Sequence, residues 1–209
     1  MDNTENKELF LSTFRKNVQR PGAEKLLAWM ETTDFFTAPA STRFHAAYEG
    51  GLLDHSMNVY NVLISKHFDP ASDDIESFTI VSLLHDLCKA GFYKTELRNR
   101  KNDRGEWEKV PVYTVDDQFP YGHGEKSVYL IERFMRLRTE EAMAIRWHMG
   151  GFDESVKGGS FALAHAFEKY PLAVKLHLSD LEATYLHENR SDEHENPDLY
   201  PENRTAGLL

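Results

Sequence analysis

The sequence has only one cysteine, Cys88, among its 209 residues. A single cysteine excludes a disulfide within the chain, as is usual for proteins of a reducing compartment. No apolar run approaches the roughly 18 residues that a membrane-spanning helix needs, and the first residues, "MDNTENKELF", are too polar and acidic for a secretory signal. We therefore expect a cytoplasmic protein that has no membrane partner.

Basic residues are also scarce, because 24 Lys and Arg face 34 Asp and Glu and leave a net charge of −10. Proteins that bind long duplex nucleic acid usually carry a basic face, so this balance argues against such a partner. It does not argue against a small anionic substrate bound at a metal. The hydrophobic content of 41% is ordinary for a soluble globular chain, and the length suits one domain, alone or with extensions.

Hydrophobic periodicity predicts an all-α fold, a bundle of about seven or eight helices. The helices are expected at residues 6–19, 22–33, 52–67, 74–90, 123–137, 139–149, 160–167 and 169–188. Residues 92–115 differ, because they alternate aromatic, β-branched and charged side chains around the turn sequence "NDRG". That pattern predicts one inserted β-hairpin. The polar, proline-containing residues 189–209 are expected to form a C-terminal tail.

The stretch "TIVSLLHDLCKAG", residues 79–91, places His85 and Asp86 in the middle of an otherwise apolar predicted helix. Burying an ionised carboxylate without a partner is costly, whereas a carboxylate that coordinates a cation is paired. The pair therefore indicates a buried cation, and an aspartate has the two oxygens that bridging two ions requires.

Further imidazoles and a carboxylate lie at core-facing or terminal positions of other predicted helices: His55, His123, His148 and Asp180. Helical bundles build metal sites from such inward-pointing side chains on separate helices. Any one of these histidines alone is more often a hydrogen-bonded core residue than a ligand. Together they favour a site for Mn, Fe, Ni or Zn, since imidazole and carboxylate suit these ions.

In this order, the motifs resemble those of the HD-domain metal-dependent phosphohydrolase superfamily, in particular its two-metal branch. The resemblance covers residues 44–186 and reads "GGLLDHS…SLLHDLCKAG…HGEKS…IRWHMGG…SDLEA". The first two motifs are similar to the HD domain of some 3′-to-5′ exoribonucleases and to stand-alone HD hydrolases of bacteria and phages. The resemblance implies a helical extension at 1–43 and an HD domain at 44–188 with the hairpin inserted at 92–115.

The resemblance also implies a ligand set for one or two divalent ions, of which Mn, Fe, Ni, Co, Zn and Mg remain open. The first ion would be held by His55, His85, Asp86 and Asp180, and the second by Asp86, His123 and His148. The chain departs from the pattern at Met149, where related two-metal members often carry a second consecutive histidine. Methionine is a poor ligand for such metals, so the second ion is the less secure expectation.

The implied activity is hydrolysis of a phosphoester of a nucleotide, cyclic nucleotide or short oligonucleotide by metal-activated water. Asp86 and Lys89 would be the catalytic residues, because Lys89 matches the lysine that faces the phosphate in "HDxxK" members. It would stabilise charge on the phosphoryl oxygens or protonate the leaving group. The resemblance does not distinguish a phosphomonoesterase from a phosphodiesterase.

Aromatic and basic side chains near these motifs suit a nucleotide, since a base can stack and a phosphate can pair. The candidate substrate-binding residues are Lys89, Arg146, Tyr48, Tyr121 and Lys126. Ordinary packing and surface ion pairs explain the same residue types equally simply. Two other functions stay open: a catalytically weak HD module that binds or senses a nucleotide, and an interaction protein whose hairpin mediates assembly around a structural metal.

Overall fold

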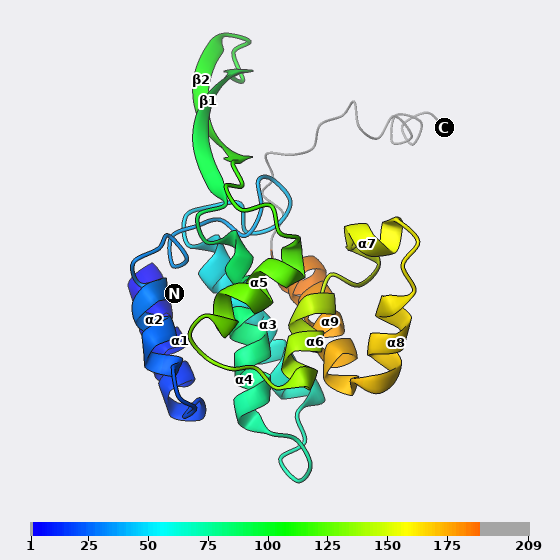
Figure 1. The fold of residues 1–209 in the computed structure, drawn as a ribbon. Helices are drawn as coiled ribbons and strands as arrows, with labels where there is room; N and C mark the ends of the chain where they lie inside the picture. The colour runs from blue at the N-terminus through cyan, green and yellow to red at the C-terminus, as the bar shows by residue number, and fades with distance from the viewer. Residues whose placement is uncertain (1, 189–209) are drawn as a thin grey trace, which may run out of the picture.

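Two adjacent helices, α3 (Gly51–His67) and α4 (Ile75–Leu84), form the centre of the molecule (Figure 1). The structure is a computed structural model, and it describes residues 2–188. Gly50 takes a left-handed φ of +84° where α3 begins, and the Asp74 carboxylate accepts the Glu76 N–H to cap α4. These two starts fix the helices that carry the first predicted ligands.

The other helices surround this pair on both sides (Figure 1). They are α1 (Asn3–Asn17), α2 (Ala23–Met30), α5 (His123–Glu132), α6 (Thr139–Trp147), α7 (Glu154–Lys157), α8 (Ala162–Lys169) and α9 (Pro171–Glu182). Residues 2–188 thus contain nine α-helices, the shortest of four residues, within the region we expected to hold seven or eight. The predicted helical bundle with one inserted hairpin is confirmed.

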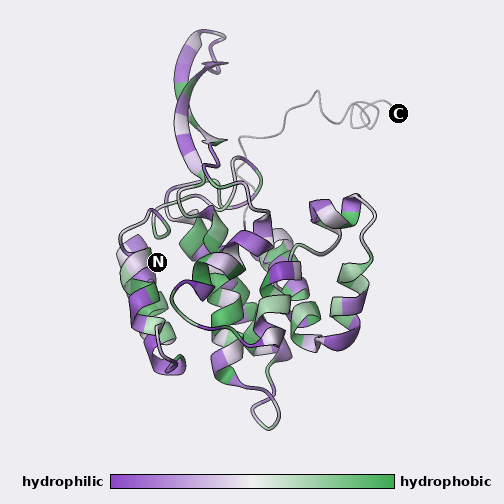
Figure 2. Cartoon of the chain, viewed as in Figure 1, coloured by the Kyte–Doolittle hydropathy of each residue, from purple (hydrophilic) through white to green (hydrophobic). Residues whose placement is uncertain are grey.

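One hydrophobic core runs through the helices, and their apolar faces turn toward it in Figure 2. Helix α1 packs on α4, α9 packs on both α3 and α6, and α5 packs on α6. Fully buried side chains of this core include Phe10, Leu53, Leu83, Ile145 and Leu176. The core therefore holds the ends of α3, α4, α6 and α9 close together, which is where the predicted ligands lie.

The helix predicted over 74–90 ends early, so our placement of His85 and Asp86 in mid-helix is wrong. His85 Nδ1 donates to the Ser82 carbonyl oxygen at 2.8 Å. In a continuing helix that carbonyl would accept the N–H of Asp86. Asp86 instead has φ −101° and ψ 21°, a sparsely populated conformation, and a 3₁₀ turn, η1 (Leu87–Lys89), follows.

Other predicted boundaries also move by several residues. Within the helix predicted over 169–188, the α-helical part ends at Glu182, and the chain then forms one π-helical segment, η3 (Ala183–His187). The helices predicted over 123–137 and 139–149 end at Glu132 and Trp147. Such π segments are often found at functional sites, and this one leads the chain from Asp180 to Glu188.

The hairpin consists of β1 (Tyr93–Lys101) and β2 (Trp107–Val115), which pair antiparallel and project from the helical body (Figure 1). Its turn is where the sequence predicted it. Asn102 Oδ1 accepts the N–H groups of Arg104 and Glu106, and Gly105 supplies a φ of +77°.

Two remaining predictions concern the membrane and the tail. Within residues 2–188, none of the helices combines the length and the apolar character needed to span a bilayer. The predicted tail at 189–209 lies outside the described residues.

Candidate metal centre

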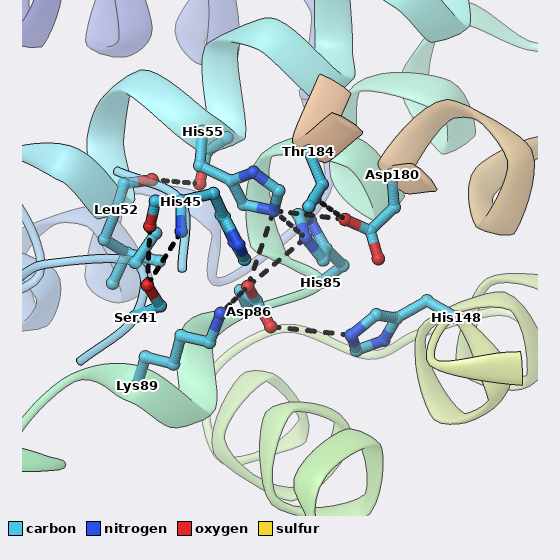
Figure 3. Close-up of polar contacts among 12 residues, drawn as sticks. Ser41, His45, Leu52, His55, His85, Asp86, Lys89, His148, Asp180 and Thr184 are labelled. Carbon is cyan, nitrogen blue, oxygen red and sulfur yellow. Dashed lines mark hydrogen bonds and ion pairs between the residues drawn. The ribbon is translucent and has the colours of Figure 1, made fainter. Parts of the chain in front are cut away.

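The structure brings the six predicted ligands together from five helical segments, and Figure 3 shows most of them. His55 comes from α3, the His85–Asp86 pair follows α4, and His148 is the C-cap of α6. Asp180 lies in the last turn of α9, and His123 is the first residue of α5. In groups of three, His, Asp and Cys ligand atoms lie within 4.8 Å of one another. This buried cluster could hold a metal ion.

Asp86 lies between two pairs of histidines and presents one oxygen to each pair. Its Oδ2 is 3.6 Å from His55 Nε2 and 3.5 Å from His85 Nε2. Its Oδ1 is 2.7 Å from His123 Nε2 and 3.4 Å from His148 Nε2. The carboxylate is thus arranged as a bridge between two adjacent positions.

The first position is completed by Asp180. His55 Nε2 lies 3.2 Å from His85 Nε2 and 3.2 Å from Asp180 Oδ1. Two ligand atoms each about 2.1 Å from one ion, at tetrahedral or octahedral angles, are about 3.0–3.4 Å apart. The spacing of these atoms therefore fits a shared cation.

The outward nitrogens of three histidines are held by acceptors. His85 Nδ1 donates to the Ser82 carbonyl, His148 Nδ1 donates to the Ile145 carbonyl at 2.7 Å, and His55 Nδ1 contacts Glu188 Oε1 at 2.8 Å. A carbonyl oxygen can only accept, so Nδ1 carries the hydrogen and, in the neutral form of each ring, Nε2 carries the lone pair. Metal-ligating histidines are fixed in this way in general.

These lone pairs meet few donors inside the cluster. His148 Nε2 is buried and makes no hydrogen bond to any residue of the described chain. His85 Nε2, Asp180 Oδ1 and Asp86 Oδ2 are further acceptors around His55 Nε2. Converging acceptors and an orphaned buried nitrogen suit a bound cation, so the donor set fits a metal.

Charge in the cluster is almost completely buried, and the pKa shifts reflect this. Burial alone would raise the pKa of Asp86, but Lys89, His85 and His123 hold it well below its usual range. The Lys89 ammonium lies 2.6 Å from Asp86 Oδ2, and the Asp86 side chain is only 3% exposed. Burial likewise opposes the charged form of Asp180, yet His55 lowers its pKa. Both carboxylates are therefore ionised and need positive charge beside them.

The histidines divide according to their neighbours. Burial disfavours the imidazolium of His55, but Asp180 and Glu188 outweigh it and raise the pKa of His55 to about 10. Burial is also outweighed at His123, where Cys88 and Asp86 raise the pKa to about 10. Burial lowers the pKa of His85 to about 4. Without a metal, protons on two histidines supply the positive charge that the carboxylates require.

Four of the predicted substrate-binding residues bond elsewhere. Lys126 pairs with Asp117 at 2.6 Å, and Arg146 pairs with Asp153 at 2.7 Å. Both charges therefore already have a partner within the protein, and the substrate roles of Lys126 and Arg146 stay predictions.

The two tyrosines lie nearer the surface. Tyr48 is 49% exposed and donates from its hydroxyl to Asp54 Oδ2 at 2.8 Å. Tyr121 is 52% exposed and stacks on Phe119 with ring centroids 5.3 Å apart. Within residues 2–188, no hydrogen bond or ring stacking joins either tyrosine side chain to the six predicted ligands, and their substrate roles also stay predictions.

Sequence reasoning missed two residues that the structure places at the cluster. The Glu188 carboxylate, with a side chain 3% exposed, contacts His55 Nδ1, and its Oε2 is buried without a partner in the described chain. Cys88 Sγ lies 3.4 Å from His123 Nδ1. Only the closeness of Cys88 to Asp86 in the sequence could have signalled either residue.

Comparisons of this chain with family models, with curated proteins and with solved structures found no match. A function therefore has to be inferred from the chemistry of the candidate metal centre itself.

Proposed function

We propose that the protein is a metal-dependent phosphohydrolase of the HD type, which hydrolyses a phosphoester of a nucleotide, cyclic nucleotide or short single-stranded oligonucleotide. One observation carries the proposal: Asp86 presents one oxygen to the His55–His85 pair and the other to the His123–His148 pair. A carboxylate bridging two sets of imidazoles suits a pair of divalent ions.

In the proposal, His55, His85, Asp86 and Asp180 hold one ion, and Asp86, His123 and His148 hold the second. Ions bound there would supply Lewis acidity toward phosphoryl oxygens and would lower the pKa of a water molecule. Cys88, 3.4 Å from His123, is a free thiol, so the proposal includes a cytoplasmic, reducing location.

The chain's own contribution is a buried ligand cluster and a positive charge. His85 and His148 are fully buried, and the low dielectric around them strengthens every charge interaction there. The Lys89 side chain is 11% exposed, so its ammonium borders the cluster and can face a substrate phosphate. A fixed cation at that place stabilises negative charge that develops on phosphoryl oxygens.

The test is metal stoichiometry joined to a substrate screen. Elemental mass spectrometry on protein purified without chelator should find two divalent metals per chain, and one in His148→Ala. The loaded protein should then hydrolyse at least one member of a panel of nucleotides, cyclic nucleotides and short oligonucleotides. Two bound metals with no turnover of any of them would refute the phosphohydrolase proposal.

A second candidate is a module that binds a nucleotide without hydrolysing it. The observation that favours it is the 2.6 Å ion pair of Lys89 with Asp86, in which the aspartate already balances the charge of the lysine. Equilibrium binding together with single-turnover assays separates the two functions. The binding module predicts a saturable complex whose nucleotide is recovered intact.

A further inference from the structure

The loop before α3 presents a fifth imidazole, that of His45, to the candidate metal centre. The His45 ring centroid lies 5.1 Å from that of His55, and Lys89, Asp180 and Glu188 are close enough to act on its charge. Figure 3 shows His45 beside His55, on the side of the cluster where Lys89 lies. His45 Nε2 is buried and makes no hydrogen bond to any residue of the described chain.

The loop that carries His45 is held by its own hydrogen bonds. Ser41 Oγ accepts the N–H groups of Phe44 and His45, at 2.9 and 3.1 Å, and donates to the His45 carbonyl at 2.7 Å. The Ala40 N–H closes the loop on the Ala46 carbonyl at 3.0 Å. Both neighbours of His45 are thereby fixed, so its backbone has little freedom.

The next residue, Ala46, is strained. Its φ of +43° is the only positive value at a non-glycine residue within the described chain. A Cβ on Gly51 would lie 1.9 Å from the Ala46 carbonyl oxygen, so a glycine is needed there for the loop to close against α3. Such strain persists only where surrounding contacts impose it, and it clusters at functional sites. Here the strained residue directly follows His45, whose ring lies 5.1 Å from that of His55.

We propose that His45 positions the substrate, by a hydrogen bond between Nε2 and an oxygen of a bound phosphate group, on the side of the metal centre flanked by Lys89. This inference rests on the proposed phosphohydrolase function. A metal ligand is the competing role, because His45, His55 and Glu188 also lie within 4.8 Å of one another. The ligand role is disfavoured because no hydrogen bond in residues 2–188 fixes the His45 ring, whereas the rings of His85 and His148 are fixed.

The experiment compares His45→Ala and His45→Gln with a control on the same loop, the exposed Arg43→Ala. All three should keep the metal content and the melting temperature of the wild type. His45→Ala should lower kcat/KM for the substrate found in the screen by about 10- to 100-fold, the usual range for a hydrogen bond to a charged group. Glutamine, which keeps a hydrogen-bonding group, should recover part of this loss, and Arg43→Ala should lose nothing.

Binding of inorganic phosphate to the metal-loaded protein, measured by calorimetry, tests His45 without any turnover. His45→Ala should bind phosphate about 10- to 100-fold more weakly than the wild type. Equal affinities would overturn the assignment, as would loss of bound metal from His45→Gln, which would make His45 a ligand. If the wild type hydrolyses nothing but its phosphate affinity depends on His45, the phosphohydrolase proposal fails and the His45 assignment stands.

Discussion

The metal centre and the β-hairpin place their charged and apolar side chains in opposite ways. In the metal centre the Asp86 side chain is 3% exposed and His85 is fully buried, whereas on the hairpin Lys94 and Glu96 are nearly half exposed. The hairpin also leaves Leu97 and Trp107 exposed, by 66% and 70%. Figure 2 shows that the hairpin is largely hydrophilic, whereas the helices contain many hydrophobic residues.

The difference in burial determines how much an ion pair affects the stability of this chain. The exposed Lys94–Glu96 pair, at 3.2 Å, is screened by solvent and contributes little to stability. The Lys89–Asp86 pair, at 2.6 Å, lies in a low dielectric, where removing one partner leaves a buried charge uncompensated. Equivalent substitutions in the two regions should therefore have very different effects.

The largest effect is expected for Asp86→Asn, matched with Asp103→Asn in the hairpin turn. The asparagine removes the bridging charge between both histidine pairs, so the variant should retain no metal and no phosphoesterase activity. Elemental mass spectrometry and the substrate screen measure both. Asp103→Asn should match the wild type. Full turnover in Asp86→Asn would contradict the proposed centre.

Lys89→Met, matched with Lys94→Met, comes next. Methionine keeps much of the apolar stem but removes the cation that we propose faces the substrate phosphate, so activity should fall by roughly 100-fold or more while the metal stays bound. Steady-state kinetics and metal analysis on the same preparation separate these two properties. A Lys89→Met enzyme as active as Lys94→Met would leave Lys89 as a structural partner of Asp86.

Removing the metal should destabilise the centre and leave the fold intact. A ligand present at 1,000 times its Kd stabilises by about 4 kcal/mol, which for a chain of this size corresponds to roughly 8–16 °C in Tm. Calorimetry before and after chelation measures the shift, and circular dichroism should still show a helical protein. Complete unfolding on chelation would identify a structural metal, as the interaction-protein alternative requires.

The metal-free protein should also depend on pH in a defined direction. The pKa values of His55 and His123 are raised to about 10, so their stabilisation is complete below pH about 6.5 and is lost as the pH rises toward 10. The pKa of His85 is lowered to about 4, so the unfolded chain takes up a proton first and stability also falls from pH about 6.5 to 4.

Denaturant unfolding of the chelated protein should therefore show a loss of at least about 1 kcal/mol between pH 7 and 9. The metal-loaded protein should lack this loss, because metal binding requires the imidazoles to be neutral and displaces their protons. A flat profile for the metal-free protein over this range would mean that the two histidines are not protonated.

The smallest effect is expected in the hairpin. Replacing residues 95–113 by a short glycine-containing turn should change the free energy of unfolding by less than about 1 kcal/mol, because an isolated two-stranded hairpin is marginally stable and mostly contacts itself. Metal content should stay the same. Loss of activity with retained metal would instead show that the hairpin takes part in covering the substrate.

Several features followed from local sequence alone. Apolar periodicity identified the helices, and the alternation around "NDRG" identified the hairpin and its turn, because both patterns depend on neighbours a few residues apart. The unusual His85–Asp86 pair pointed to a buried cation because a buried carboxylate needs a partner wherever the chain places it.

Only the tertiary structure decided how these residues face one another. The sequence could not reveal that α4 ends at Leu84, where the His85 ring bonds to the Ser82 carbonyl that the Asp86 N–H would use in a continuing helix. Nor could it place His45 and Glu188 beside His55, since contacts across 10 and 133 positions arise from how the loop and η3 return to α3. Composition and periodicity determined which residues were buried in the helices. The packing of α3, α4, α6 and α9 determined that the histidine and aspartate side chains on these helices converge on one site.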